Sequence, residues 1–344
     1  MKDLSIIIVN YRCWDKLAKC LASLVLIPET AFSFEVIIVD NASKDGRLFN
    51  FKQLYKQFRF ISSPGNWGFA NGNNIGSANA CGKYLLFLNP DTIVGENALT
   101  QMIQVVKISP ANSIISCRQI RENGREDKPY GTFPSPTTLC GWTRAVVKLL
   151  HLDISPVQNE NFIFPDWVSG SVVLMSKSSF ISIGGWNEKF WMYYEDVDLC
   201  HRARVAGGDI LMLKSVAVIH NHGGSSRSDA RIAVLTKTEV NISQHEYISI
   251  HANGLKGILM HVFLIFNNVV LGLAPALTGL ILYFNKSLSI EAKIYLKLLN
   301  YYFNALLRYT WISPRSVVHP DFYPYRYLTD KNLISLSDNS PERA

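Results

Sequence analysis

Residues 4–118 alternate between short apolar runs and longer segments of mixed polarity. The runs lack strict polar alternation, which is typical of strands buried on both faces of a parallel sheet. They are LSIIIV (4–9), EVIIVD (35–40), FRFIS (58–62), KYLLFLN (83–89) and SIISC (113–117). The segments between them have the spacing of helices and lie near 14–26, 46–57, 69–80 and 96–107. The pattern therefore predicts an α/β fold.

Polar residues and glycines follow four of these predicted strands. Ligands of open α/β sheets bind outside the carboxyl ends of the strands, so these positions predict a site. They are Asn10 and Tyr11, Asp40 and Asn41, the segment PGNWGFANGNNIG (64–76), and Asn89-Pro90-Asp91. Each one alone is equally compatible with a turn, because Asn, Asp and Gly are ordinary turn residues. Four strand ends together favour a binding site.

Asp91 ends an apolar strand and directly follows Pro90, whose ring restricts the backbone. A carboxylate in this place, facing a glycine-rich segment, suits a divalent metal that shares its oxygen ligands with a diphosphate. An N-cap for the following helix is the alternative, and one aspartate can do both. The first strand is followed by YRCWDK and not by G-x-G-x-x-G, which argues against a nicotinamide-dependent dehydrogenase.

The segment FWMYYEDVDLCHRARVAGG (190–208) places acidic residues directly after aromatic ones. Its second half predicts a helix that begins near Glu195 and Asp196, where the helix dipole favours negative charge. We expect Leu199 and Val205 near the buried side of this helix. Charge decoration of a helix start is one interpretation of the carboxylates. The preceding aromatic residues favour a sugar site, because ring faces stack on sugars while a carboxylate accepts a hydroxyl proton.

His220 and His222 stand in VIHNHGGSS, at the end of another apolar strand. A histidine there is either structural or a ligand for a metal or phosphate, and one of the two is expected to face the site. Residues 119–165 are rich in proline, glycine and charge. They predict a loop or lid with little structure of its own.

The charge balance favours an anionic partner, since 34 basic residues against 27 acidic ones give a net charge of +7. Nucleic acid is not expected, because no binding module or interleaving of aromatic and basic residues is present. The six cysteines form no C-x-x-C pair and predict neither a zinc site nor a disulfide framework. With an N-terminal apolar run too short for a secretory signal, this predicts reduced thiols in a cytoplasmic protein.

The C-terminal third contains GILMHVFLIFNNVVLGLAPALTGLILYFN (257–285), 29 residues without Asp, Glu, Lys or Arg. A bilayer needs about 20 apolar residues, so the length suffices, but Asn267, Asn268 and Pro275 argue against a simple span. Residues 250–330 include seven basic residues and three acidic ones. This favours helices embedded in, or re-entrant at, an anionic membrane surface. A buried dimerisation hairpin is the alternative.

Several motifs, taken in order, resemble the family 2 inverting glycosyltransferases, in the subgroup of bacterial rhamnosyltransferases that build surface polysaccharides. They are SIIIVNYR, VIIVDNASKDG, GNWGFANGNNIG, LLFLNPDT, VSGSVVLMSKSSFISIGGWNEKFWMYYEDVDLCHRARVAGG and IHNHGGSS, and they span about residues 3–226. The resemblance implies a GT-A fold, a Rossmann-like mixed sheet with helices on both faces. It implies a catalytic domain over 1–230, which leaves 231–344 as a mainly α-helical, membrane-associating region.

The resemblance also implies roles for individual residues. Asp196 would be the general base and Glu195 would position the acceptor. Asp91 and His220, with His222 as the fallback, would bind Mg²⁺ or Mn²⁺. The donor would contact Asn10, Tyr11, Asp40, Asn41, Asn66, Gly68, Asn74 and Asn89, with Asp40 at the nucleotide base. The acceptor would contact Trp186, Trp191 and Tyr194. The D-x-D of the broader family appears here as Asn89-Pro90-Asp91, which implies weaker metal affinity.

The implied reaction is an inverting displacement, in which Asp196 takes the proton of the attacking hydroxyl while the metal and His220 stabilise the departing nucleotide diphosphate. The implied donor is dTDP-rhamnose. The implied acceptor is a polyprenyl-diphosphate-linked saccharide at the cytoplasmic face of the bacterial inner membrane, for O-antigen, lipopolysaccharide or capsule. A homodimer stays open.

Two other functions share an α/β sheet. A non-catalytic nucleotide-sugar-binding scaffold subunit is disfavoured, because it need not retain Asp91, Asp196 and His220. A nucleotidyltransferase calls for a glycine- and basic-rich phosphate loop after the first strand, and YRCWDKLAK contains no glycine.

Overall fold

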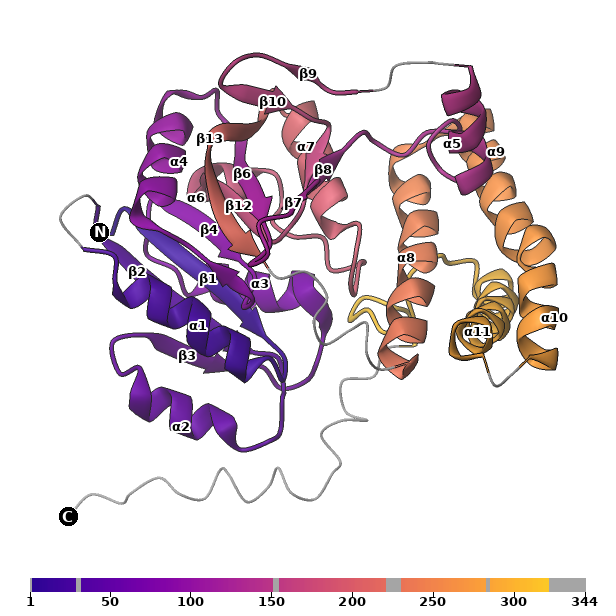
Figure 1. Ribbon diagram of the computed structural model, residues 1–344, viewed down its shortest axis with the longest axis horizontal. Coiled ribbons are helices and arrows are strands. Elements are labelled where there is room, and N and C mark those ends of the chain that lie inside the picture. The colour runs from indigo at the N-terminus through magenta and orange to yellow at the C-terminus, as the bar shows by residue number, and fades with distance from the viewer. Residues whose placement is uncertain (1, 29–31, 151–154, 221–229, 283–284, 322–344) are drawn as a thin grey trace.

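The structure, a computed structural model, describes residues 2–28, 32–150, 155–220, 230–282 and 285–321 (Figure 1). A sheet covered by helices on both faces is followed by a separate group of helices. The main sheet runs in the spatial order β3-β2-β1-β4-β12-β6-β13-β10-β9. Its long strands are β1 Leu4–Asn10, β2 Phe34–Asp40, β3 Arg59–Ser62, β4 Tyr84–Leu88, β6 Ile114–Ile120, β12 Val172–Ser176 and β13 Ile210–His220. The helices packed on it are α1 Trp14–Val25, α2 Arg47–Leu54, α3 Gly68–Ala78, α4 Glu96–Ile108, α6 Lys177–Ser182 and α7 Glu195–Val205.

The first four strands confirm the predicted parallel arrangement, since β1 pairs in parallel with both β2 and β4, and β2 with β3. The run at 113–117 does form a strand, β6, but β6 does not lie beside β4. β12 lies between them and is antiparallel to both. The sheet is therefore mixed, and the carboxyl ends of β1, β2 and β4 meet at one edge.

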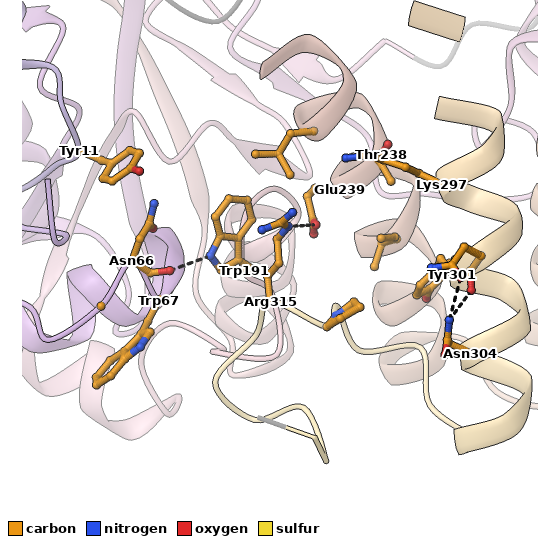
Figure 2. A pocket seen from close by; sticks show the side chains of 15 residues that line it. Tyr11, Asn66, Trp67, Trp191, Thr238, Glu239, Lys297, Tyr301, Asn304 and Arg315 are labelled. Atoms are coloured by element: carbon orange, nitrogen blue, oxygen red, sulfur yellow. Dashed lines mark hydrogen bonds and ion pairs between the residues drawn. The ribbon is translucent and has the colours of Figure 1, made fainter. Parts of the chain in front are cut away.

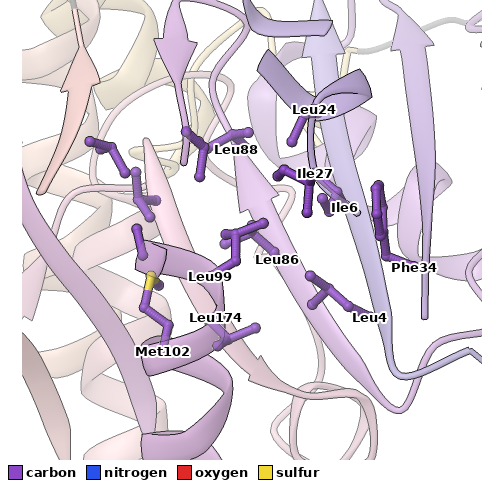
Figure 3. Packing of buried hydrophobic residues seen from close by; sticks show 14 of the residues in the cluster. Leu4, Ile6, Leu24, Ile27, Phe34, Leu86, Leu88, Leu99, Met102 and Leu174 are labelled. Atoms are coloured by element: carbon purple, nitrogen blue, oxygen red, sulfur yellow. The ribbon is translucent and has the colours of Figure 1, made fainter. Parts of the chain in front are cut away.

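Two apolar layers hold this sheet from opposite sides. Leu4, Ile6 and Ile8 of β1 belong to the cluster under α1 and α4, whereas Ile7 belongs to the cluster on the other face (Figure 3). Complete burial of each such side chain contributes about 1.5–3 kcal/mol. Because β1 is buried on both faces, its last residue, Asn10, is held in a fixed position.

The prediction that residues 119–165 carry little structure was wrong. They contain α5 Gly141–Leu149 and the short strands β7 Glu126–Asp127, β8 Tyr130–Gly131, β9 Val157–Gln158 and β10 Phe162–Phe164. β10 pairs with β13, and β8 pairs with β11 Trp167–Val168. Ile163 and Val168 join the core, so widely spaced apolar residues order this segment through contacts distant in sequence.

The chain after residue 230 is helical, with α8 Ala230–His251, α9 Gly254–Ile265, the π-helical η1 Phe266–Leu271, α10 Leu273–Ile281 and α11 Lys286–Arg308. α8 packs on α11 through Val234 and Ile242 on one side and Leu298 and Tyr301 on the other. Residues Gly254–Ile281 form one helix that is long and apolar enough to cross a membrane, with a mean hydropathy of 2.0 in its most apolar window and 22% of that window buried.

The polar residues inside this apolar helix have structural explanations. Asn268 is buried and donates to the hydroxyl of Tyr302 on α11, at 2.8 Å. Pro275 lies in the first turn of α10, where a missing N–H costs little because the π-helical turn has already broken the α-helical ladder.

Candidate active site

The β5 strand (Thr92–Ile93) brings together the two residues predicted to bind metal. β5 follows Asp91 directly and pairs with the end of β13, so that Thr92 lies opposite His220. As a result, Nε2 of His220 lies 3.1 Å from Oδ1 of Asp91. The two residues are 129 positions apart in sequence, and the β5–β13 pairing accounts for their meeting.

Gln119 orients the imidazole of His220. Its Oε1 lies 2.7 Å from Nδ1 of His220, and its amide nitrogen donates to Oγ of Ser171 at 2.7 Å. The donation fixes Oε1 as the acceptor, so Nδ1 of His220 carries a proton. The other ring nitrogen, Nε2, therefore faces Asp91 with a lone pair whenever the imidazole is neutral, as a metal ligand requires.

Asp91 is also approached by Lys16 of α1, whose Nζ lies 3.4 Å from Oδ2. Burial by itself raises the pKa of Asp91, but the hydrogen bond and charge of a protonated His220, followed by the charge of Lys16, outweigh it and lower that pKa. The carboxylate is therefore ionised at neutral pH, in a small basic environment that suits a diphosphate.

Asp91 and His220 fit a divalent ion that is only partly held by protein. Among the described residues, no group of three or more His, Cys, Asp or Glu side chains could enclose a metal. One carboxylate and one imidazole leave most coordination positions to other oxygens, as in sites where Mg²⁺ or Mn²⁺ shares its shell with substrate phosphates.

The predicted nucleotide side consists of buried, mutually bonded polar groups. Asn10 and Asp40 are both buried, and Nδ2 of Asn10 lies 3.5 Å from Oδ1 of Asp40. Burial raises the pKa of Asp40, and hydrogen bonds from Ser43 and Asn10 offset this only in part. Asn41 donates to Oδ1 of Asn66 and to the carbonyl of Gly68, each at 3.0 Å. Asn89 lies at the end of β4, where its backbone N–H donates to Ser171 at 2.9 Å.

The glycine-rich segment is hydrogen-bonded to, and closely packed on, Trp191. Gly68 has φ +91°, and a Cβ there would lie 2.1 Å from the carbonyl oxygen of Trp191, so no larger residue fits. The N–H of Phe69 donates to that carbonyl at 3.0 Å, and the indole N–H of Trp191 donates to the carbonyl of Asn66 at 3.2 Å.

A cavity of about 600 Å³ opens beside this fastening, between the sheet and the C-terminal helices (Figure 2). Tyr11, exposed by 44%, lines its sheet side, and Trp191 stands between that side and the helices. Arg315 lies over the Trp191 ring, 5.3 Å from its centroid, and pairs with Glu239 of α8 at 3.2 Å. Lys297 and Tyr301 of α11 line the helical side.

The predicted helix start at Glu195 and Asp196 is confirmed by α7. The two residues before it, Tyr193 and Tyr194, have φ values of 70° and 67°, a conformation that costs bulky residues energy and is concentrated at functional sites. Asp196 accepts hydrogen bonds from the N–H groups of Gly170 and Val197, both at 2.9 Å. These contacts hold its carboxylate in one orientation.

Both carboxyl groups are protonated more readily than usual. Burial, followed by the charge of Asp196, raises the pKa of Glu195 well above its ordinary value, and burial also raises the pKa of Asp196. Oε2 of Glu195 is buried without a hydrogen-bond partner within the described part of the chain. An unpaired buried acceptor is costly, and a ligand hydroxyl could satisfy it.

Asp196 also lines a second cavity, of about 480 Å³. Its lining also includes Tyr193, Tyr194, Ser169 and Trp167, and Val240 of α8. The hydroxyl of Tyr194 accepts a hydrogen bond from Gln244 at 2.8 Å. A substrate hydroxyl in this cavity can reach an aspartate with a raised pKa, which is the arrangement that a general base requires.

Three residues do not take the places predicted for them. Trp186 is 1% exposed and packs edge-on against Phe69 and Phe87, so it belongs to the core. Asn74 uses its whole amide to hold the 186–188 segment, donating to Trp186 and Glu188, both at 2.8 Å, and accepting from the N–H of Trp186. Val205 is 78% exposed. His222 lies outside the described residues.

Asp198 is the third carboxylate of the segment 190–208, after Glu195 and Asp196, and its contacts are structural. It is fully buried, and it pairs with Arg202 of its own helix at 2.7 Å and with His251 of α8 at 2.8 Å. Lys16, Gln119 and Arg315 were not predicted at all. For Lys16, its place one turn into the helix after the first strand was an available signal. For the other two, only the fold brings them to the site.

Two family models match the chain. Residues 5–161 match the model described as "Glycosyl transferase family 2", and residues 161–222 match the one described as "N-terminal domain of galactosyltransferase".

Several curated proteins are similar over about two thirds of the chain. The low-salt glycan biosynthesis hexosyltransferase Agl10 of Haloferax volcanii is 30% identical over 227 residues, which cover 64% of this chain and 68% of that protein. The rhamnosyltransferase WbbL of Escherichia coli K12 is 29% identical, covering 65% of this chain and 85% of that protein. The N-acetylglucosaminyl-diphospho-decaprenol L-rhamnosyltransferase of Mycobacterium tuberculosis is 27% identical, covering 66% and 78%.

Among solved structures, GalNAc-T7 with UDP, GalNAc and Mn²⁺ aligns with a TM-score of 0.51 at 13% identity. The alignment covers 74% of this chain and 52% of that chain, about half of its length. At this identity the likeness concerns the fold alone.

Proposed function

Since the chain belongs to glycosyltransferase family 2, has the GT-A fold and is a glycosyltransferase, we propose that it transfers one sugar, with inversion, from a nucleotide-diphosphate donor to a hydroxyl of a lipid-linked saccharide. The observation that carries the proposal is the contact of Asp91 with His220, at 3.1 Å, on the sheet edge where Asn10 and Asp40 also end their strands.

In this proposal the nucleotide lies against Asp40 and Asn41, and the diphosphate lies against Asp91, His220 and Lys16. Mg²⁺ or Mn²⁺, held by Asp91 and His220, supplies positive charge for the leaving diphosphate. Lys16 adds its own charge to the same group. Gln119 keeps His220 in the tautomer that presents Nε2.

Asp196 acts as the base. Its carboxylate takes the proton of the acceptor hydroxyl while the oxygen attacks the anomeric carbon and the nucleotide diphosphate leaves from the opposite face. The N–H groups of Gly170 and Val197 hold the carboxylate in place. Glu195 positions the acceptor through its unpaired oxygen, and Trp191 and Tyr194 contact the acceptor sugars.

L-rhamnose from dTDP-rhamnose is the proposed donor, because two of the curated relatives are named rhamnosyltransferases. The proposed acceptor is a polyprenyl-diphosphate-linked saccharide used for bacterial surface polysaccharide, and the decaprenol-linked name of one relative supports it. We place the enzyme at the cytoplasmic face of the inner membrane, with 1–230 as the catalytic domain and 231–344 as the membrane-associating region. The homodimer stays a prediction.

The membrane proposal is supported by the helix Gly254–Ile281. Most of its exposed side chains are large and apolar, which is costly in water. They include Leu255, Ile258, Val262, Phe266, Val270, Leu277, Leu280 and Ile281. The basic excess between residues 250 and 330 suits anionic lipid headgroups.

The test is release of nucleotide diphosphate from dTDP-, UDP- and GDP-sugars by the purified chain, with Mn²⁺ or Mg²⁺ and a prenyl-diphosphate-linked sugar acceptor. We expect acceptor-dependent release from dTDP-rhamnose, lost in Asp196→Asn and retained in Asp209→Asn, which changes an exposed aspartate between α7 and β13. Donor binding without release from any sugar nucleotide would favour the scaffold function instead.

A further inference from the structure

The cavity around Asp196 is also lined by residues that the proposed chemistry leaves unused. They come from the segment 128–139 and from α5, and they include two cationic side chains, Lys128 and Arg144. Asp196 is the only acidic residue among the side chains that line the cavity. The same cavity is therefore lined by the base and by two positively charged side chains.

In the part of the chain that the structure describes, neither cation is paired with a carboxylate. Within the described residues, no ion pair involves Arg144 or Lys128, and Lys128 instead lies over the ring of Tyr130, 5.2 Å from its centroid. The charge of Arg144 reaches the acceptor side of the site. Burial raises the pKa of Tyr194 to about 12, and Arg144 is close enough to oppose that rise.

α5 joins this cavity to the apolar helix. Cys140 packs with Met260 and Leu264 of α9, and its Sγ lies 3.8 Å from the carbonyl of Phe263. Figure 1 shows α5 beside α9. At 100° per residue, Arg144 and Lys148 share one flank of α5, whereas the exposed Val146 and Leu149 lie on another. One short helix thus presents basic residues on one flank and apolar residues on another.

We propose that the cavity between Asp196 and Arg144 binds the diphosphate of the lipid-linked acceptor, with Arg144 and Lys128 contacting the phosphates and α5 lying at the lipid surface. The inference rests on the proposed function, because it takes a prenyl diphosphate as the carrier of the acceptor sugar. In such an acceptor one sugar ring separates the reacting hydroxyl from the diphosphate. A cavity of about 480 Å³, within the range of small-ligand sites, has room for both groups.

This assignment explains why Arg144 lies in the same cavity as the base without a protein partner. A guanidinium binds two phosphate oxygens in a fixed geometry, and the contact is strongest where water is partly excluded. With the diphosphate bound to these cations, another hydroxyl of the same sugar is left to meet Asp196.

The experiment measures binding of farnesyl diphosphate, and of farnesol as the phosphate-free match, to the full chain in detergent with saturating dTDP and Mg²⁺. The nucleotide keeps the probe out of the donor site. We expect the wild type to bind farnesyl diphosphate at least about tenfold more tightly than farnesol. Arg144→Gln should remove most of that preference and Lys128→Gln part of it.

Lys148→Gln is the matched control, because Lys148 is an exposed cation on the same flank of α5 but does not line the cavity. It should change farnesyl diphosphate binding less than twofold and weaken attachment to phosphatidylglycerol vesicles as much as Arg144→Gln does. Equal effects of the two variants on farnesyl diphosphate, or no preference of the wild type for the diphosphate, would overturn the inference. In that case the α5 cations serve only lipid headgroups.

A kinetic arm separates this inference from the proposed function. With a prenyl-diphosphate-linked acceptor, Arg144→Gln should raise the acceptor KM about tenfold and leave kcat and the donor KM unchanged. With an alkyl glycoside of the same sugar, it should change nothing. If the wild type transfers no sugar while Arg144-dependent binding of farnesyl diphosphate persists, the proposed transfer fails and the binding site stands. If transfer occurs and Arg144→Gln leaves the acceptor KM unchanged, the transfer stands and the site fails.

Discussion

The sheet region and the C-terminal helices differ in how far their apolar side chains are buried within the protein. Every residue of β1 is buried by the protein itself, whereas only 22% of the most apolar window of Gly254–Ile281 is buried. In the sheet region, positions are explained by neighbours within the chain. In the helix Gly254–Ile281, most large apolar side chains are exposed, although the polar Asn268 is bonded within the chain. The environment that the helices are suited to therefore lies outside the chain.

The largest effect should come from the sheet region. Asp91→Asn removes the carboxylate that contacts both His220 and Lys16, and we expect kcat to fall by about a thousandfold or more, with no recovery at high Mn²⁺. The measurement is steady-state turnover across a Mn²⁺ titration. Glu96→Gln, at an exposed position at the start of α4, should be near wild type, and equal losses in both variants would contradict the role of Asp91.

The next effect should separate the regions most directly. The double variant Ile258→Asn and Val262→Asn places two amides on the exposed face of α9, and we expect vesicle attachment to weaken by about tenfold or more. Turnover in detergent with a soluble acceptor should not change. Vesicle flotation measures attachment, and Val205→Asn, an equally exposed apolar position on α7, should leave it intact. If the double variant still binds vesicles as the wild type does, the exposed face of α9 is not the membrane-binding surface.

A smaller effect, on the pH dependence of stability, is expected where α8 packs against the sheet region. Burial raises the pKa of Glu246 on α8 to about 7, although Lys189 opposes the rise. A raised pKa means that the folded state binds a proton more tightly, so this contribution to stability is complete below the pKa of the unfolded chain and disappears as pH rises through about 7. The free energy of unfolding of the wild type should therefore fall between pH 5 and pH 8, by up to about 3 kcal/mol from this group.

Glu246→Gln should remove that pH dependence, and urea unfolding at the two pH values measures it. Glu160→Gln, which changes an exposed glutamate in the sheet region, should keep it. A wild-type stability that rises over the same interval would show that Glu246 is ionised in the folded protein.

The smallest effect tests the polar contacts within the helices. Tyr302→Phe removes the hydroxyl that Asn268 and His245 share, and leaves a buried amide with one partner fewer. We expect the free energy of unfolding to fall by about 1–2 kcal/mol. Tyr309→Phe, at a side chain 94% exposed, should not change it. If the two variants are equally stable in detergent, the amide of Asn268 needs no partner within the protein. The helix Gly254–Ile281 could then cross a membrane with its amides exposed.

Local pattern and chemistry predicted the parts of the fold in which neighbours in sequence decide the structure. The strands before Asn10, Asp40 and Asp91 and the helix beginning at Glu195 could be identified because apolar runs and helix-start charges are local signals. The insertion of β12 between β4 and β6 could not, because strand order depends on pairing between distant segments.

The same limit applies to the site. Asp91 and His220 were both predicted, but their contact depends on β5, a strand of two residues that no periodicity shows. Trp186 and Asn74 looked like ligand contacts because aromatic and amide side chains serve binding and packing equally well. The prediction that Val205 lies near the buried side was wrong. Six residues at 100° each put it about 120° away from Leu199 around the helix, where it is exposed.

The fastening of Gly68 to Trp191 limits how this enzyme could be re-engineered. Two backbone segments, 64–69 and 190–191, meet through the Phe69 N–H and the indole of Trp191 with no space for a Cβ between them. With the donor assigned to 64–69 and the acceptor to 190–191, as proposed above, donor and acceptor specificities are not exchangeable modules in this chain. A chimera that imports a foreign glycine-rich segment would have to import the matching aromatic segment with it, and libraries for new sugars should vary the two together.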